Sequence, residues 1–125
     1  TKYFDLIIHL ARSSFEQVDY EVNMTPDRSM LNIQAKHGKY NIFVTELFSD
    51  QKRKYRYYVL QADYVEAGFD NSPDPRAIRL KYGKIGKERA GKLVPHMHLN
   101  DKNHLILTEE MTFQKFIEWF RINIE

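Results

Sequence analysis

The sequence has no cysteine, only five glycines and four prolines, and no long apolar run. Without cysteine the chain forms no disulfide, holds no thiolate-bound metal and has no cysteine nucleophile. No apolar stretch approaches the roughly 18 to 20 residues that span a bilayer, which excludes a transmembrane helix. Because a cysteine-free chain fits a reducing compartment, we expect a cytoplasmic protein with no membrane partner.

What is present is the composition of one globular domain. The 125 residues are 42% hydrophobic and 29% charged, which is too apolar for a disordered chain. Eight phenylalanines, eight tyrosines and one tryptophan supply side chains for a core. We therefore expect residues 1–125 to form a single domain.

Charge is distributed unevenly, although the net charge is only +2. Residues 52–92 hold 11 Lys and Arg against 5 Asp and Glu, a local net charge of +6. The rest of the chain holds 8 against 12, a net charge of −4. A basic segment of this kind either meets phosphate groups or is a lysine-rich loop in solvent, and the sequence leaves both open.

Hydrophobic periodicity predicts a helix near each end of the chain. Residues 2–15 carry an apolar stripe at helical spacing that ends at Ser13 and Ser14. A second helix follows Thr108 or Thr112, either of which has the hydroxyl of an N-cap. Its stripe consists of Phe113, Phe116, Ile117 and Phe120.

Between these helices the period changes to two, which indicates strands. Alternating runs lie at residues 16–24, which we expect to be half-buried, and at 31–36, 40–47, 55–62, 64–69 and 104–107. Short polar turns join most of them, as in an antiparallel meander. We therefore predict an α+β fold in which an N-terminal helix, five or six strands and a C-terminal helix packed on the sheet follow one another.

Residues 70–92 form the least regular segment. They contain two prolines, three glycines and most of the bases, and we interpret them as a basic loop excursion with a short strand around residues 77–82. Long excursions in compact domains are often functional. Arg76, Arg79 and Lys81 lie here and are candidates for binding nucleic acid.

The clearest polar motif is Pro95-His96-Met97-His98. In an extended segment His96 and His98 point to the same side, about 7 Å apart at Cα. Paired imidazoles act as acid and base in phosphodiester cleavage, or ligate a metal together, or are simply surface histidines. The hypothesis that we carry forward is acid–base catalysis with no metal and no cofactor.

Two acidic residues are further candidates. Glu46 takes an inward position on the otherwise apolar face of residues 40–46, and a buried carboxylate is costly unless it is paired. Asp70 opens Asp70-Asn71-Ser72-Pro73, which is either an ordinary turn or a display of polar groups at a strand end. Either acid could orient an imidazole, provided that it lies near the histidines.

Residues 54–58 interleave aromatic and basic side chains. Bases of RNA stack on exposed tyrosines beside cations, which makes Lys54, Arg56 and Tyr58 candidates for nucleic-acid contact. Cross-strand packing is the alternative role for aromatic residues in a strand.

The order of these motifs resembles the TumE-type toxins of prokaryotic toxin–antitoxin pairs. The likeness rests on a Glu-bearing strand, Tyr55-Arg56-Tyr57-Tyr58, Phe69-Asp70-Asn71-Ser72-Pro73, the two histidines and the aromatic terminal helix, over roughly residues 16–122. Family members commonly have histidines after the Asp-Asn-x-Pro element, where this chain has Asp74-Pro75. The resemblance implies a cognate antitoxin as partner and action on RNA.

Three functions follow from the sequence. The first is a toxin-like ribonuclease that needs no metal, with His96 and His98 as acid and base, Glu46 or Asp70 as the group that orients them, and Arg76, Arg79 or Lys81 stabilising the phosphorane. The second is a non-catalytic nucleic-acid-binding module, and the third is a protein-interaction subunit. A homodimer is an open alternative for the assembly.

Overall fold

The computed structural model describes residues 1–83, 86 and 88–125. Residues 84, 85 and 87 of the predicted excursion lie outside the described residues. The elements in chain order are α1 (Lys2–Ser14), β1 (Glu16–Thr25), β2 (Arg28–His37), β3 (Tyr40–Ser49), β4 (Lys52–Gln61), β5 (Tyr64–Asp70), α2 (Pro75–Tyr82), β6 (His96–Leu99), β7 (His104–Leu107) and α3 (Phe113–Asn123).

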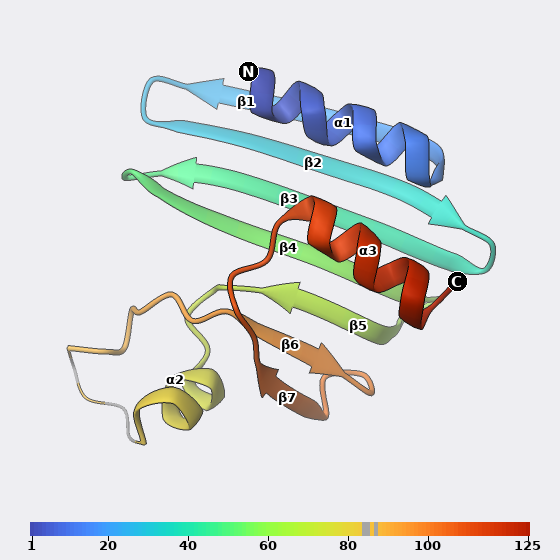
Figure 1. Cartoon of the computed structure of the whole chain (residues 1–125). Helices are drawn as coiled ribbons and strands as arrows, with labels where there is room; N and C mark the ends of the chain where they lie inside the picture. Colours follow the sequence, from blue (N-terminus) through green and yellow to red (C-terminus); the bar gives the residue numbers. More distant parts are fainter. Residues whose placement is uncertain (84–85, 87) are drawn as a thin grey trace.

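The strands form one antiparallel sheet in which sequence order is also spatial order, β1 to β7 (Figure 1). This confirms the predicted α+β meander. The described residues form seven strands rather than five or six, because His96–Leu99 pairs with β5 on one side and with β7 on the other. The predicted strands do not include this piece, which the sequence suggested only as an extended histidine motif, and its pairing on both sides shows that it is a strand.

Helices α1 and α3 both lie on one face of the sheet, and between them and the strands is the main core (Figure 1). Phe116 of α3 packs against Tyr57 and Phe69 of the sheet. The threonine that caps α3 is Thr112, whose hydroxyl accepts a hydrogen bond from the Lys115 N–H. Both terminal helices are therefore where the apolar stripes predict them.

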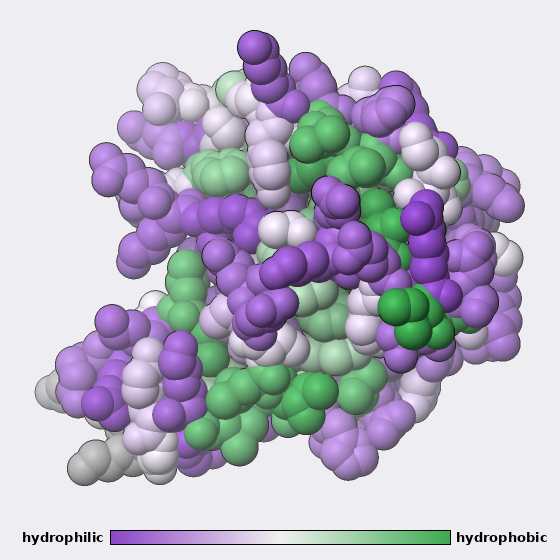
Figure 2. All heavy atoms as spheres, in the orientation of Figure 1, coloured by the Kyte–Doolittle hydropathy of each residue, from purple (hydrophilic) through white to green (hydrophobic). Residues whose placement is uncertain are grey.

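Figure 2 shows this helix-bearing face from outside. Hydrophobic groups show between patches of hydrophilic residues in the upper half of the view and gather again low in the view over β7, where Ile106 is exposed. None of the helices in the described residues is long and apolar enough to cross a membrane.

Helix α2 replaces the short strand that we predicted at residues 77–82. The Asp74 carboxylate accepts a hydrogen bond from the Arg76 N–H, and Pro75 takes the first helical position, where a missing N–H costs nothing. Gly83 ends the helix at φ +85°, a conformation that suits glycine. The start and stop signals were thus present in the sequence, but the eight-residue helix is too short for a clear apolar stripe.

Strand β1 is also different from the prediction. It lies at the edge of the sheet and is exposed along nearly its whole length, with only Val18 partly buried. Alternation along a strand predicts two distinct faces, but burial of one of them requires an element above it. Tyr20, Val22 and Met24 are all exposed, so β1 is not half-buried.

The second face of the sheet is covered only in part. A small cluster of Ala77 and Ile78 from α2 with Val94, Tyr82 and Leu105 closes it near β7. Over β3 and β4 this face has no helix in the described part of the chain, and we call it the open face. Phe43 and Arg56 are exposed there.

Candidate functional site

The Asp-Asn motif and the two histidines meet where β5 and β6 pair. Asp70 is directly opposite His96 in the register, and Gly68 is opposite His98. Since side chains alternate between the faces of a strand, Asp70, His96 and His98 all point to the same side, away from α1 and α3. The sequence prediction that the imidazoles share a side is confirmed.

The three side chains form a buried cluster. The His96 Nε2 atom lies 3.1 Å from Asp70 Oδ1, and the His98 Nε2 atom lies 3.5 Å from Asp70 Oδ2. The two imidazole rings are perpendicular, with centroids 4.8 Å apart. His96 has 0% and His98 has 4% of its surface exposed, so neither ring is open to solvent.

Two hydroxyl groups and one amide fix the Asp70 carboxylate. The Tyr58 hydroxyl donates to Oδ2 at 2.7 Å, while the Ser72 hydroxyl and amide donate to Oδ1 at 2.6 and 3.0 Å. Burial alone would raise the pKa of Asp70, but the contacts with His96, His98 and Ser72 outweigh it and hold that pKa well below its usual range. Asp70 is therefore a carboxylate.

The same contacts act in the opposite sense on their partners. Burial works to lower the pKa of His96, but the Asp70 carboxylate and the Val94 carbonyl outweigh it and raise that pKa. Burial raises the pKa of Tyr58, and the neighbouring Asp70 charge raises it further, so the phenol stays protonated as a hydrogen-bond donor.

Gly68 makes room for Tyr58. A Cβ atom at Gly68 would lie 2.6 Å from Cε2 of the Tyr58 ring, closer than van der Waals contact allows. The ring thus lies flat across the β5 backbone, which brings its hydroxyl group to Asp70 two residues further along. The packing of Tyr58 thus requires glycine at this position, which no sequence pattern indicated.

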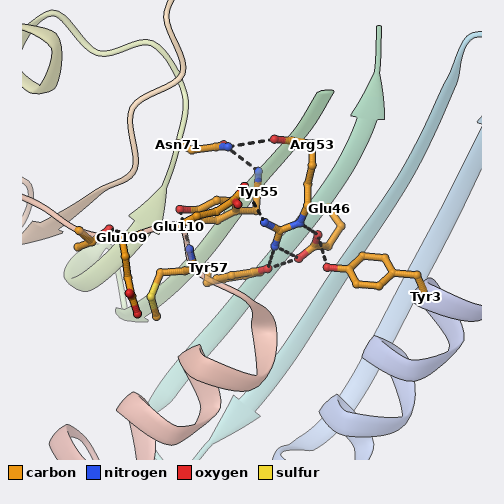
Figure 3. A network of polar contacts seen from close by, with 10 residues as sticks. Tyr3, Glu46, Arg53, Tyr55, Tyr57, Asn71, Glu109 and Glu110 are labelled. Carbon is orange, nitrogen blue, oxygen red and sulfur yellow. Dashed lines mark hydrogen bonds and ion pairs between the residues drawn. The ribbon is translucent and has the colours of Figure 1, made fainter. Parts of the chain in front are cut away.

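Asn71 continues the pairing of β5 with side-chain atoms. Its Oδ1 accepts from the Tyr55 N–H at 3.1 Å, and its Nδ2 donates to the Arg53 carbonyl at 3.0 Å. Both partners are on β4 (Figure 3). Asn71 thereby anchors the chain immediately after Asp70 and fixes the direction in which the excursion leaves the sheet.

Glu46 does not belong to this cluster. It lies on the helix-bearing face, fully buried, in a network with Arg53, Tyr57 and Tyr3 (Figure 3). The Arg53 Nε and the Tyr3 hydroxyl each donate to it at 2.9 Å, and the Tyr57 hydroxyl is a further donor. The prediction that Glu46 is inward-facing is correct, but its position on the opposite face excludes it as the group that orients the histidines.

This network ties helix α1 to the sheet. Burial and the Glu46 charge raise the pKa of Tyr3 to about 12, which keeps its hydroxyl group protonated. Burial lowers the pKa of Arg53, but the hydrogen bond to Glu46 outweighs it and keeps the guanidinium charged. Since a buried carboxylate needs such partners, the geometry explains Glu46 by structure alone.

A cavity of about 390 Å³ opens on the open face beside the cluster. Its charged walls are Arg56 and Lys102, which both lie over the ring of Tyr58, at 5.1 and 5.2 Å from its centroid. Phe43, on the neighbouring strand, is 39% exposed. The other lining residues are Thr45, Leu60 and Val65.

Positive charge continues from this cavity to helix α2. Arg76 Nη1 donates to the Lys102 carbonyl at 3.0 Å, and Arg76 and Arg79 line a second hollow between α2 and β7. We call Arg56, Lys102, Arg76 and Arg79 the basic track. Sequence reasoning missed Lys102, which lies outside the basic segment and reaches the track only through the turn between β6 and β7.

The remaining candidates lie near the track but not in it. Lys54 is exposed two residues before Arg56, so alternation along β4 places it on the open face. Lys81 is exposed on α2, with its ammonium group 5.6 Å from the centroid of the Tyr82 ring. Tyr55 and Tyr57, by contrast, stack on each other inside the core.

No family model, curated protein or solved structure matches this chain. The likeness to TumE-type toxins therefore depends on the quoted motifs alone.

Proposed function

We propose that this protein is a toxin-like component of a toxin–antitoxin pair that acts on RNA, and that it binds single-stranded RNA on the open face of its sheet. The observation that carries the proposal is the cavity over Tyr58, where Arg56 and Lys102 cover a tyrosine ring that is only 7% exposed. The ring open for stacking is therefore Phe43 beside them and not Tyr58, which the sequence had suggested. Guanidinium and ammonium groups pair with phosphate, and exposed aromatic rings stack on unpaired bases. The toxin assignment comes from the motif resemblance.

The chemistry of each group suits one part of a nucleotide. The exposed Phe43 ring offers a stacking surface, while Arg56 and Lys102 supply charge at the rim of the same cavity. Arg76 and Arg79 continue the charge over a second hollow of about 590 Å³. This arrangement favours a strand of several nucleotides over a single small anion.

Cleavage by His96 and His98 stays a prediction. A general acid or base must lie within hydrogen-bond reach of the proton that it transfers. Both rings are buried, and the Nδ1 atom of His96 is bound to the Val94 carbonyl at 2.7 Å. RNA held in the cavity does not contact the buried rings, so binding is the function that the geometry supports best.

The test is fluorescence anisotropy of the purified protein with a labelled single-stranded RNA across a salt series. On single strands each phosphate contact contributes about 0.7 to the slope of log K against log salt. Arg56→Ala and Lys102→Ala should each weaken binding and lower the slope by about that amount. Arg121→Ala, on the exposed side of α3, is the matched control and should bind as the unaltered protein does.

Two results would end the proposal. One is an affinity that salt does not change, and the other is equal weakening by Arg121→Ala and Arg56→Ala. Incubation of RNA with the protein and with His98→Ala tests cleavage separately, because loss of cleavage with intact binding assigns chemistry to the cluster. Growth arrest on expression, relieved by the product of a neighbouring gene, tests the toxin assignment.

A protein-interaction role is the second candidate, and β1 favours it. This edge strand has ten residues and pairs only with β2 in the described part of the chain. Such an edge is a template for a strand from another chain, whether an antitoxin or a second copy. Co-purification of a partner that Val22→Pro disrupts, with RNA binding unchanged, would support it, whereas a chain that is monomeric and unaccompanied would not.

A further inference from the structure

The buried cluster brings two imidazoles and a carboxylate within a few ångströms of one another. The His96 Nδ1 atom lies 2.7 Å from the Val94 carbonyl oxygen, which only accepts hydrogen bonds, so Nδ1 must carry a proton. In a neutral imidazole the Nε2 atom then has no proton and carries a lone pair, so it can only accept a hydrogen bond. That lone pair lies 3.1 Å from Asp70 Oδ1, which is also an acceptor. This contact is favourable only with a positive charge between the two atoms, which either a second proton on the imidazole or a bound metal ion supplies.

Two imidazole nitrogens of the cluster have no hydrogen-bond partner in the described part of the chain. Among the described residues, His96 Nε2 and His98 Nδ1 are buried side-chain atoms without a hydrogen bond. One ligand atom from each of Asp70, His96 and His98 lies within 4.8 Å of the other two. In a tetrahedral zinc site with bonds of about 2.0–2.2 Å, neighbouring ligand atoms are about 3.3 Å apart. The 3.1 Å between His96 and Asp70 already fits that spacing.

We propose that Asp70, His96 and His98 form a binding site for a divalent transition-metal ion, with Zn²⁺ as the best match to two imidazoles and a carboxylate. This differs from the metal-free chemistry expected from the sequence. Its ligands are separate from the RNA-binding residues, since none of the three lines the cavity on the open face.

The surroundings have the features of an outer ligand shell. Metal-bound histidines usually donate their second ring N–H to a carbonyl or carboxylate, as His96 does to Val94. Ligating carboxylates are themselves hydrogen-bonded, as Asp70 is by Tyr58 and Ser72. These contacts hold the ligand atoms in place before an ion arrives.

Asp74 is suited to the fourth position. Its Oδ2 atom lies 4.0 Å from His96 Nε2, and its side chain is partly open to solvent. A second carboxylate would balance the two charges of the ion. Because Asp74 also caps α2, coordination would join β5, β6 and the start of α2, and would hold the excursion against the sheet.

The experiment measures metal content directly. The full chain, stripped with a chelator and dialysed against ZnCl₂, should retain one zinc per chain by elemental analysis, and the urea midpoint should rise with zinc concentration. CoCl₂ in its place should give the visible absorption of four-coordinate Co²⁺. The variants His98→Ala and Asp70→Asn should bind zinc at least tenfold more weakly. The control His104→Ala, at an exposed position, should bind zinc as the unaltered chain does.

A readout on the unaltered chain covers the case in which a variant does not fold. Zinc should shift the ring-proton resonances of His96 and His98 and leave those of His9 and His104 in place. No retained metal would overturn the proposal and identify the cluster as a protonated imidazolium–carboxylate pair. Shifts at His9 or His104, or equal affinity in folded His98→Ala, would overturn it as well.

Discussion

Replacing Gly68 with alanine tests the close packing that aims Tyr58 at Asp70. The new Cβ would lie 2.6–2.8 Å from three atoms of the Tyr58 ring. Carbon atoms pack at about 3.5–4.0 Å, so the ring must move by about 1 Å. A movement of this size stretches the 2.7 Å hydrogen bond from Tyr58 to Asp70 beyond useful length.

The expected loss of stability follows from these two effects. Overpacking costs about 1–3 kcal/mol, and a hydrogen bond to a charged group contributes about 1.5–3 kcal/mol. Alanine gains about 0.5–1 kcal/mol over glycine in a strand because the unfolded chain has less freedom to lose. The sum is a net destabilisation of about 1.5–5.5 kcal/mol.

Urea unfolding followed by far-ultraviolet circular dichroism measures this change, at equal metal content in every sample. The matched background is Tyr58→Ala, in which the ring that meets the new methyl group is absent. There the Gly68→Ala substitution should be neutral or slightly stabilising. A cost of the same size in both backgrounds would refute the argument, because it would place the strain somewhere other than the Tyr58 ring.

Two further predictions concern the network on the helix-bearing face. Glu46→Ala leaves Arg53 without its buried partner and should destabilise the fold by about 3–5 kcal/mol in urea unfolding. RNA affinity should stay unchanged, and reduced affinity in the folded variant would contradict the assignment of Glu46 to structure. Because burial and the Glu46 charge raise the pKa of Tyr3 from 10.0 to about 12, its contribution is complete below pH 10 and lost as the pH rises through 12. The free energy of unfolding should therefore fall less steeply between pH 10 and 12 in Tyr3→Phe than in the exposed control Tyr64→Phe. Equal pH profiles in the two variants would contradict this role of Tyr3.

Local patterns predicted much of this fold because they depend on neighbouring residues alone. The stripe of Phe113, Phe116 and Phe120 locates α3, and the alternation from Tyr40 to Glu46 defines both faces of β3. The pattern fails where burial depends on a distant element. β1 alternates like a buried strand but is exposed at the edge of the sheet. α2 is too short for its apolar side to show a period.

In the candidate site, too, local spacing predicted some features and strand pairing decided the others. Spacing alone puts His96 and His98 on one side of a strand, since alternation is a property of the backbone. Whether an acid faces them depends on strand pairing, which brings Asp70 opposite His96 and leaves Glu46 on the far side of the sheet. Lys102 likewise joins Arg56 only because the β6–β7 turn folds back over Tyr58.

The sequence by itself determined the α+β class, the order of helices and strands, and the residues with chemistry to offer. Only the tertiary structure decided which of them meet, that the histidines are buried, and that the cations line an open cavity. The physical reason is that period and propensity act over a few residues. Register and the choice of face, in contrast, are set by pairing between segments far apart in the chain.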